Sequence, residues 1–396
     1  MRVWMVNPFD NLPPEGNRPQ RYWLMSAAFA RAGHDVTLWT SDFSHSRKAR
    51  RAMDPAFPDP GFRVKAVPTP AYGANICLSR VWSHLVLARR WARLAAAEER
   101  PDLVVASSPP LSLCAAARRF CKARGVPFVV DVMDAWPETF ERVAPRLLLA
   151  PLARTARANY MGADAISAVS ERYIDLVRSY GATAPARLFY HGIEIRAAAV
   201  SPPAETRGDG AFTIAYAGSM SASYDLATVI EAVKGMDGVR LELAGTGPQE
   251  PSLRALAAGC GRIVFHGYVG DAELCAMLAR ANAAVVPMFP ASCVGVPYKL
   301  ADYAAAGLPV LNSLEGETAR LIDENGAGAS YSAGDAKSFA RALERLRRMD
   351  ASRLRAGAAR LARLFDADFV YGEYVTWASG LFFNQKSQLT TRKETR

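Results

Sequence analysis

The chain has 396 residues, of which 50% are hydrophobic, and its mean hydropathy is close to zero. This composition excludes a long disordered chain, and because no run of 18 apolar residues occurs, we expect no membrane-spanning helix. The formal net charge of +10 indicates an anionic partner, either nucleic acid or a membrane surface.

Short apolar runs alternate with helical segments through the first half of the chain. Helices are expected at 21–32 and 111–124. Strands separated by helices in this way predict a parallel sheet with helices on both faces. The runs predicted as strands are 2–6, 35–39, 62–66, 103–106, 127–131 and 165–169.

A glycine-containing loop follows the first predicted strand. Gly16 allows a close approach of the backbone, and Arg18 supplies a positive charge. Together with Asn17 they form a candidate site for an anion or an acceptor sugar. A glycine in a strand-to-helix loop is also common without any ligand, so this motif has low specificity.

Two arginine-rich apolar stretches lie at 76–93 and 142–157. The first mixes Trp82 and Leu85 with Arg89, a composition that is typical of an amphipathic helix on an anionic lipid surface. The alternative is an internal helix whose arginines are solvated. Because the other arginines are scattered and no RNA-binding motif is present, we expect a membrane surface as the partner, and no nucleic acid.

A polar segment rich in Pro and Gly, 200–210, predicts a linker. Beyond it the alternation resumes. The predicted strands are 213–217, 240–244, 263–266, 283–286, 309–312 and 328–331, and the predicted helices are 225–234, 249–258, 271–281, 297–306 and 316–325. We therefore predict an α/β protein of two Rossmann-like, doubly wound domains that face a central cleft. The expected parts are a first domain over 1–195, a second over 211–365, a C-terminal helix over 366–384 that packs back on the first domain, and a disordered tail over 385–396.

Doubly wound sheets bind their ligands beyond the carboxyl ends of the strands. In the second half, three consecutive loops at such ends contain glycines. Each glycine alone is more typical of a tight turn, but together they favour a nucleotide. The candidate contacts in these loops are Gly218, Ser219, Gly245, Thr246, Gly247, His266, Gly267, Tyr268 and Val269.

The segment 295–310 combines a glycine-led loop, a short helix and a buried strand. Pro297 suits the first turn of a helix, whose N–H groups attract phosphate, and Lys299 adds a positive charge. Asp302 lies on the same side and is suited to accept hydrogen bonds from a ribose. The alternative is a surface helix that carries one Lys and one Asp by coincidence. The predicted contacts are Gly295, Val296, Pro297, Tyr298, Lys299, Leu300 and Asp302.

These features resemble the family 4 glycosyltransferases, which have the two-domain GT-B fold. The resemblance implies transfer of a sugar from a nucleotide-diphosphate sugar, which in this family is usually a UDP-sugar. It also implies that the transfer retains the configuration of the sugar and needs no metal or other cofactor. Residues 131–138 are similar to a variant found in bacterial envelope-polysaccharide transferases. The other segments that carry the resemblance are 31–36, 163–171, 191–192, 244–248, 265–268 and 295–310.

The chain departs from the family at the donor site. Members carry two glutamates that are separated by seven residues. The resemblance implies that the second acid holds the ribose and that the first contacts the donor sugar. Asp302 stands at the second position and Val294 at the first. Many members also place Arg and Lys where this chain has Ser219 and Tyr224. The residues left to hold the diphosphate are Gly218, Ser219, Pro297 and Lys299.

An acceptor hydroxyl must lose its proton during sugar transfer. Asp134 and Glu138, in the loop after the fifth strand of the first domain, are the candidate acids, and Asp134 is preferred. The alternative for Asp134 is a structural role, such as capping the next helix. His191, near the crossing between the domains, either contacts the sugar or packs at a hinge.

The leading hypothesis is a cytoplasmic glycosyltransferase, bound peripherally to the inner face of the plasma membrane, that extends a lipid-linked saccharide in bacterial surface-polysaccharide synthesis. The apolar run at 1–8 is too short for a signal peptide, and the six cysteines lack metal-ligand spacing, as expected of free thiols in a reducing cytoplasm. One alternative is a sugar-nucleotide epimerase or hydrolase of similar architecture. Another is an inactive transferase-like partner in an envelope-synthesis complex.

Overall fold

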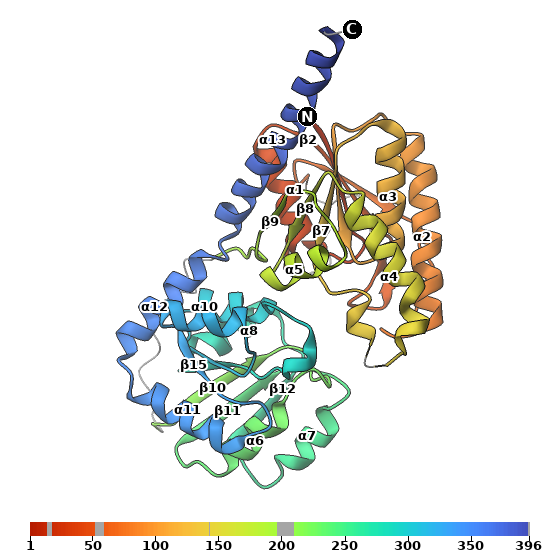
Figure 1. Ribbon diagram of the computed structural model, residues 1–396. Helices are drawn as coiled ribbons and strands as arrows, with labels where there is room; N and C mark the ends of the chain where they lie inside the picture. Colours follow the sequence, from red (N-terminus) through yellow and green to blue (C-terminus); the bar gives the residue numbers. More distant parts are fainter. Residues whose placement is uncertain (14–17, 52–58, 142, 196–209, 395–396) are drawn as a thin grey trace. The chain divides into compact units, whose positions relative to one another are not determined.

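The computed structural model describes residues 1–13, 18–51, 59–141, 143–195 and 210–394. The chain divides into two compact units (Figure 1), unit 1 with Met1–Gly192 and Ala367–Arg396, and unit 2 with Ile193–Asp366. Each unit contains a parallel sheet with helices packed against it, so the predicted pair of Rossmann-like α/β domains is confirmed. Within the described residues, no helix is both long and apolar enough to cross a membrane. Most of the predicted linker, 200–210, lies outside these residues.

The main sheet of unit 1 has the strand order β5-β2-β1-β6-β7-β8-β9, with every pairing parallel. Its central strands are buried on both faces, which explains why they appear in the sequence as continuous apolar runs. The short edge strand β9 was not predicted, because three residues with an exposed arginine give no such run. The strands are β1 (Arg2–Val6), β2 (Asp35–Ser41), β5 (Arg63–Val67), β6 (Leu103–Ser108), β7 (Phe128–Val132), β8 (Ala165–Ala168) and β9 (Ala186–Leu188), and a separate antiparallel pair is formed by β3 (Phe43–Ser44) and β4 (Ala49–Arg50).

In unit 1, α2 packs beside α3, and α1 packs beside the C-terminal helix α13. Gly125 ends α3 with a φ of 61°, the left-handed conformation that glycine adopts without strain. The backbone of α13 continues helical to Glu394, through most of the segment predicted as a disordered tail, because no Gly or Pro interrupts it after Asn384. The helices are α1 (Arg21–Arg31), α2 (Leu78–Ala96), α3 (Leu111–Arg124), η2 (Glu138–Phe140), α4 (Arg146–Met161), α5 (Glu171–Ser179) and α13 (Ala367–Glu394).

A cluster of aromatic rings fixes α2 to the sheet. The ring of Trp91 on α2 lies 6.4 Å from that of Trp4 and 6.2 Å from that of Trp39, both centre to centre. Phe120 of α3 stacks on Trp4 at 5.3 Å. Aromatic pairs at these separations stabilise a core beyond the area that they bury, so α2 is held firmly on its inner face while its outer face stays exposed.

The sheet of unit 2 has the strand order β12-β11-β10-β13-β14-β15. Three of its helices begin at an aspartate whose side chain accepts a backbone N–H, namely Asp225, Asp335 and Asp350. The strands are β10 (Phe212–Ala217), β11 (Val239–Ala244), β12 (Ile263–Gly267), β13 (Ala283–Val286), β14 (Val310–Asn312) and β15 (Gly328–Ser330). The helices are α6 (Leu226–Lys234), α7 (Glu250–Leu256), α8 (Asp271–Ala279), η4 (Pro290–Ser292), α9 (Tyr298–Ala305), α10 (Glu317–Asn325), α11 (Ala336–Arg348) and α12 (Ala351–Arg363).

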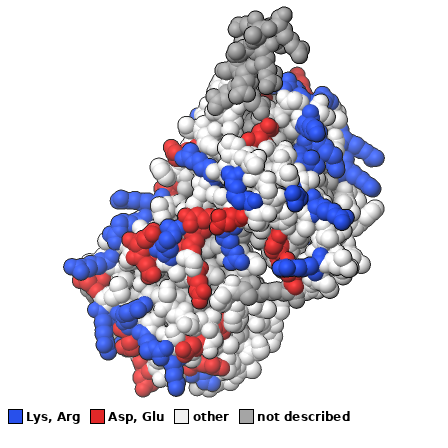
Figure 2. Space-filling view, viewed as in Figure 1, with Lys and Arg blue, Asp and Glu red and all other residues white. Residues whose placement is uncertain are grey.

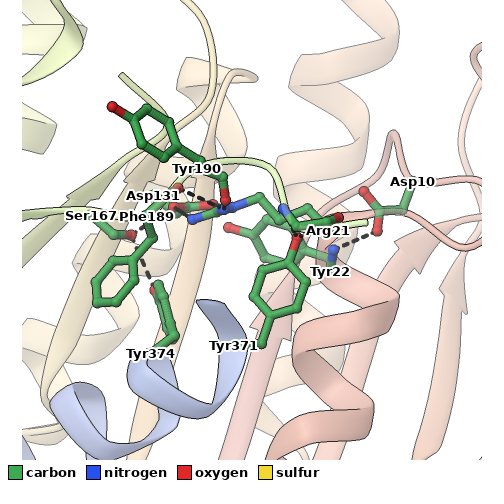
Figure 3. A network of polar contacts seen from close by, with 10 residues as sticks. Asp10, Arg21, Tyr22, Asp131, Ser167, Phe189, Tyr190, Tyr371 and Tyr374 are labelled. Atoms are coloured by element: carbon green, nitrogen blue, oxygen red, sulfur yellow. Dashed lines mark hydrogen bonds and ion pairs between the residues drawn. The ribbon is translucent and has the colours of Figure 1, made fainter. Parts of the chain in front are cut away.

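A buried ion pair lies at the centre of unit 1 (Figure 3). Arg21 of α1 and Asp131 of β7 are both fully buried, and two guanidinium nitrogens of Arg21 each donate to a carboxylate oxygen of Asp131 at 2.8 Å. The third nitrogen donates to the carbonyl oxygens of Phe189 and Tyr190, at 3.0 and 2.9 Å. A planar guanidinium group donates two parallel hydrogen bonds to one carboxylate, which gives the pair a defined geometry. The pair therefore fixes the position of α1 on the sheet.

The same network fastens α13 to unit 1 (Figure 3). Ser167 of β8 donates to Asp131 at 2.6 Å, and its hydroxyl lies 3.1 Å from that of Tyr374 on α13. The hydroxyl of Tyr371 accepts the N–H of Gly192 at 2.9 Å. A Cβ on Gly192 would lie 2.7 Å from the Tyr371 ring, so a larger residue has no room there. The last helix is therefore an internal part of the first unit.

The chain passes between the two units at two adjacent points. The N–H of Ile193, just after the first crossing, donates to the carbonyl of Phe365 at 2.8 Å, and Ile193 also pairs with Asp366 as an isolated β-bridge. The segment that leaves unit 2 is thus bonded to the segment that enters it.

We expect Asp131→Asn to destabilise unit 1 strongly, because the substitution leaves the charge of Arg21 buried without its carboxylate. The expected loss is about 3–5 kcal/mol in the free energy of unfolding. Urea denaturation followed by tryptophan fluorescence measures it selectively, since all seven tryptophans belong to unit 1.

The matched control is Asp368→Asn. Asp368 pairs with Arg31 at 2.7 Å and also joins α13 to α1, but the two side chains are 87% and 63% exposed. Exposed pairs contribute at most about 1 kcal/mol. Equal losses in the two variants would contradict a special role for the buried pair.

Candidate functional site

Three loops at the carboxyl ends of β10, β11 and β12 are joined by backbone hydrogen bonds. The N–H of Gly218 donates to the end of β11 at 3.0 Å, and that of Gly245 donates to the carbonyl of Gly267 at 2.6 Å. A Cβ on Gly245 would lie 1.9 Å from the carbonyl oxygen of Gly218, and one on Gly247 would lie 2.4 Å from that of Met220. The structure therefore brings the predicted loops together, and close packing between them requires glycine at both positions.

Lys299, in the first turn of α9, directs its ammonium group at the first of these loops. Its Nζ lies 3.1 Å from the hydroxyl of Tyr216, 4.2 Å from the centre of the Tyr216 ring and 3.7 Å from the centre of the Tyr224 ring. A Cβ on Gly218 would lie 2.9 Å from the same Nζ. The hydroxyl of Tyr216 and the two tyrosine rings therefore hold the amino group of Lys299 against the β10 loop.

Burial governs the protonation of Lys299. The side chain is only 8% exposed. Loss of water lowers the pKa of Lys299 well below its ordinary value, although the charge of Asp302 opposes this shift. A negative charge placed beside Lys299 favours its ammonium form.

The start of α9 differs by one residue from the prediction. Pro297 has an extended backbone, with ψ of 143°, and precedes the helix as its N-cap instead of lying in the first turn. Its carbonyl accepts the N–H of Leu300 at 3.0 Å and so begins the ladder of helical hydrogen bonds. The preceding loop is fixed by Thr318, whose hydroxyl donates to the carbonyl of Gly295 at 2.7 Å.

The other predicted contacts of unit 2 fall into different surroundings. Val296 and Leu300 are core residues, 7% and 0% exposed. The imidazole of His266 lies 3.4 Å from the carboxylate of Glu242, which also pairs with Arg280, whereas Tyr268 is 77% exposed. Lys299 and the glycine loops of β10, β11 and β12 thus remain as the group that the structure assembles. Thr246 lies in the β11 loop of this group, Val269 follows β12, Ser219 accepts the Tyr216 hydroxyl through its carbonyl, and Tyr298 and Asp302 lie on α9.

Sequence reasoning missed the aromatic part of this group. The sequence predicts Tyr216 only as part of a strand, and it marks Tyr224 only as a position where many family members carry Arg or Lys. Tyr303 was also missed, and its hydroxyl accepts the N–H of Ala217 at 2.9 Å, at the end of β10. The signal in the sequence is a tyrosine, Tyr216, within a mainly apolar strand, and a second tyrosine, Tyr303, on the helix that carries Lys299.

In unit 1, Asp134 shapes its own loop. Its carboxylate accepts the N–H of Ala135 at 2.8 Å, the indole N–H of Trp136 at 3.1 Å and the hydroxyl of Thr139 at 3.3 Å. Burial nevertheless raises the pKa of Asp134 above its ordinary value. The geometry is that of the structural alternative, in which Asp134 caps the turn that follows it.

The remaining candidates of unit 1 are separate from Asp134. Glu138 accepts a hydrogen bond from the hydroxyl of Tyr180 on one carboxylate oxygen, while its buried Oε2 has no partner among the described residues. Burial and the charge of Arg21 lower the pKa of His191 well below its ordinary value, so its ring is neutral. Arg18 lies just before α1, whereas Gly16 and Asn17 lie outside the described residues.

Comparison with known proteins identifies the domains. Residues 20–191 match the model of the glycosyl transferase 4-like domain, and residues 211–348 match that of the glycosyl transferases group 1. Both domains of a two-domain sugar transferase are thus present in order. The chain belongs to the glycosyltransferases of the GT-B type. No curated protein sequence matches it.

Solved structures share the fold over nearly the whole chain. Sucrose-phosphate synthase from Thermosynechococcus elongatus is 16% identical, with a TM-score of 0.75 over 97% of this chain and 99% of that chain. HepE of Anabaena, solved in complex with UDP and glucose, is 14% identical, with a TM-score of 0.68 over 96% and 100%. WaaG, a glycosyltransferase involved in lipopolysaccharide biosynthesis, is 14% identical, with a TM-score of 0.65 over 96% and 100%.

We expect Lys299→Met to change how the stability of unit 2 depends on pH. The lowered pKa means that the unfolded chain binds a proton at Lys299 that the folded protein has released. Wild-type stability therefore rises with pH between the folded pKa and the ordinary value of 10.5, by up to about 1.4 kcal/mol per pH unit. In Lys299→Met this contribution is absent and the slope is shallower.

Scanning calorimetry from pH 7 to pH 10 measures this slope. The control is Lys234→Met, which removes an exposed lysine at the end of α6 in the same unit. A Lys299→Met slope equal to that of the wild type would show that Lys299 is protonated in the unligated protein.

Proposed function

We propose that the protein transfers a sugar from a UDP-sugar to a hydroxyl of a lipid-linked saccharide in bacterial surface-polysaccharide synthesis. In this proposal the transfer retains the anomeric configuration, needs no metal, and takes place at the inner face of the plasma membrane. The observation that carries the donor site is the desolvated Lys299 between Tyr216 and Tyr224, next to loops whose glycines let their backbones pack closely together. HepE of Anabaena, which has the same fold, binds UDP.

Sugar transfer builds positive charge at the sugar carbon and negative charge on the departing diphosphate. Preorganised donors around the diphosphate therefore contribute to catalysis. Lys299 takes up a proton when the donor binds and then opposes the growing negative charge, while Asp302 on the same helix accepts hydrogen bonds from the ribose hydroxyls. Because Lys299 is already desolvated, little solvent has to reorganise during the reaction.

The acceptor hydroxyl has to lose a proton, and the structure favours Glu138 over Asp134 for this role. The oxygens of Asp134 are engaged by three donors of its own loop, whereas the buried Oε2 of Glu138 has no hydrogen-bond partner among the described residues. A general base must lie within hydrogen-bond reach of the proton that it accepts. Asp134 then acts by holding the loop that carries Glu138.

We expect Lys299→Ala to weaken UDP binding by at least about tenfold, because a charge-assisted bond to the diphosphate is lost. Isothermal titration calorimetry measures the affinity, and Lys234→Ala serves as the control. Unchanged UDP affinity in Lys299→Ala would mean that the diphosphate binds elsewhere.

Product analysis separates this function from the alternatives. A panel of UDP-sugars is incubated with and without membrane-extracted lipid-linked saccharide, and NMR identifies the anomer of the product. Release of UDP only when the acceptor is present supports transfer. Conversion without an acceptor would indicate an epimerase or hydrolase, and UDP binding without any turnover would indicate an inactive partner protein.

Exposed apolar and basic side chains of unit 1 support the membrane contact. Trp82 on α2 and Leu147 on α4 are 57% and 84% exposed. Figure 2 shows Lys and Arg side chains gathered over the part of unit 1 where α2 and α3 lie in Figure 1. Anionic lipid attracts nearby basic residues by about 1 kcal/mol each. Arg142, the first residue of the second predicted stretch, lies outside the described residues.

We expect the double variant Trp82→Ser and Leu147→Ser to lose most of its binding to vesicles of anionic phospholipid, since both side chains would enter the interface. Co-sedimentation with vesicles measures the bound fraction, and added salt should weaken wild-type binding. The control is Phe369→Ser, which removes an exposed apolar residue, 64% exposed, from α13 of the same unit. Equal loss in the control would point to a nonspecific effect.

A further inference from the structure

An apolar pocket of about 480 Å³ opens on the surface of unit 1, between α2 and α4. Residues at the start of α3 and in the turn at η2 complete its lining. Its walls are formed mainly by aliphatic and aromatic side chains, among them Val81, Leu85, Phe140 and Leu149. This volume is within the range of pockets that bind small ligands, and Leu85 is 45% exposed although it lines the pocket.

The rim of this pocket is apolar as well. Leu78 and Leu148, which line it, are 88% and 70% exposed, and Val143 is 60% exposed. Soluble proteins rarely leave such a continuous apolar surface in water unless a partner covers it. The pocket thus continues into the surface that we propose for membrane contact, so an apolar chain could enter it from a bilayer.

One side of the pocket carries polar groups. His84 is only 7% exposed, yet its Nε2 has no hydrogen-bond partner in the described part of the chain. Arg80, one helical turn earlier on α2, lies over the Trp136 ring at 4.9 Å, and its Nε is also buried without a described partner. Burial and the charge of Arg80 lower the pKa of His84 to about 3, so the His84 ring is neutral. The positive charge on this side of the pocket therefore comes from Arg80.

A buried polar atom without a partner costs free energy unless a ligand satisfies it. The N–H of Arg80 Nε and the guanidinium charge are suited to an oxygen-rich anion such as a phosphate, and neutral His84 adds a donor in the tautomer that carries its proton on Nε2. The rest of the pocket is suited to hydrocarbon. A ligand that satisfies both parts has a phosphorylated head and an unbranched or isoprenoid chain.

We infer that this pocket binds the phosphorylated isoprenoid end of the lipid-linked acceptor, with the chain between α2 and α4 and a phosphate at Arg80 and His84. The inference rests on the proposed function for the identity of the lipid. Trp136 and Phe140, which line the pocket, belong to the same loop as Glu138. Binding of the lipid at this loop therefore brings the attached saccharide toward the proposed acceptor base.

Soluble short-chain analogues test the pocket without a membrane. The probes are geranyl phosphate, farnesyl phosphate, farnesol and inorganic phosphate, each titrated into the full-length protein by calorimetry below its aggregation concentration. We expect farnesyl phosphate to bind at least about tenfold more tightly than geranyl phosphate, because the longer chain buries more apolar surface. Farnesol and inorganic phosphate should each bind at least about tenfold more weakly than farnesyl phosphate. Equal affinity for both chain lengths would overturn the inference, and this comparison needs no variant.

Two pairs of variants locate the site. Leu85→Trp fills the pocket and should weaken farnesyl phosphate binding at least about tenfold; its control is Leu94→Trp, on the same helix and 42% exposed but outside the pocket. Arg80→Gln should abolish the preference for farnesyl phosphate over farnesol, whereas Arg119→Gln, which removes an exposed arginine of α3, should keep it. The inference would be overturned if only the control variant of a pair lost the measured affinity or preference, or if neither variant of the pair lost it.

The remaining outcomes separate this site from the proposed function. Dihexanoyl phosphatidylglycerol that competes with farnesyl phosphate at equal concentration would show a general phospholipid site and overturn the inference. Selective farnesyl phosphate binding in a protein without transferase activity would leave the pocket standing and refute the function. Transfer to a lipid-free saccharide as efficient as to the lipid-linked one would leave the function standing and refute the pocket's role.

Discussion

The buried ion pair between Arg21 and Asp131 is the interaction on which unit 1 depends. Removing two charges from water costs several kcal/mol per ion, and only complete hydrogen bonding offsets that cost. Arg21 meets this condition by donating to both oxygens of Asp131 and to two backbone carbonyls after β9. Because Ser167 and Tyr374 continue the network, one arrangement of α1, the sheet and α13 satisfies every partner.

The two units use buried basic side chains in opposite ways. In unit 1 the charge of Arg21 is matched by a carboxylate at 2.8 Å, and the result is a fixed core. In unit 2 the Nζ of Lys299 lies against two tyrosine rings, where loss of water lowers its pKa. An amine in such surroundings is stabilised when an anion binds beside it, as the proposed donor site requires. The two environments thus separate a paired charge in a core from the amine of the proposed donor site.

The sequence allowed prediction of the architecture, because buried parallel strands form apolar runs that alternate with helical segments. The helices α11 and α12 were not among those predicted. The sequence also singled out Lys299 from its helix and neighbouring glycines. It could not reveal partners that are distant in the chain. Tyr216 and Lys299 are 83 residues apart, and Arg21 and Asp131 are 110 residues apart. For Asp134 the sequence allowed a catalytic and a structural reading, and only the three donors around its carboxylate favour the second. The pocket of unit 1 likewise needed α2 and α4 to be placed side by side.

The position of α13 has a consequence for biosynthesis. Tyr371 and Tyr374 lie in the core of unit 1 together with Phe29 and Phe189, yet they leave the ribosome after all of unit 2. Domains commonly fold in the order of their synthesis. Here unit 2 has its complete sequence first, and the first-made unit waits with an open apolar groove until the last helix arrives. A chain cut short before Ala367 therefore carries an intact second unit and a first unit that lacks part of its own interior.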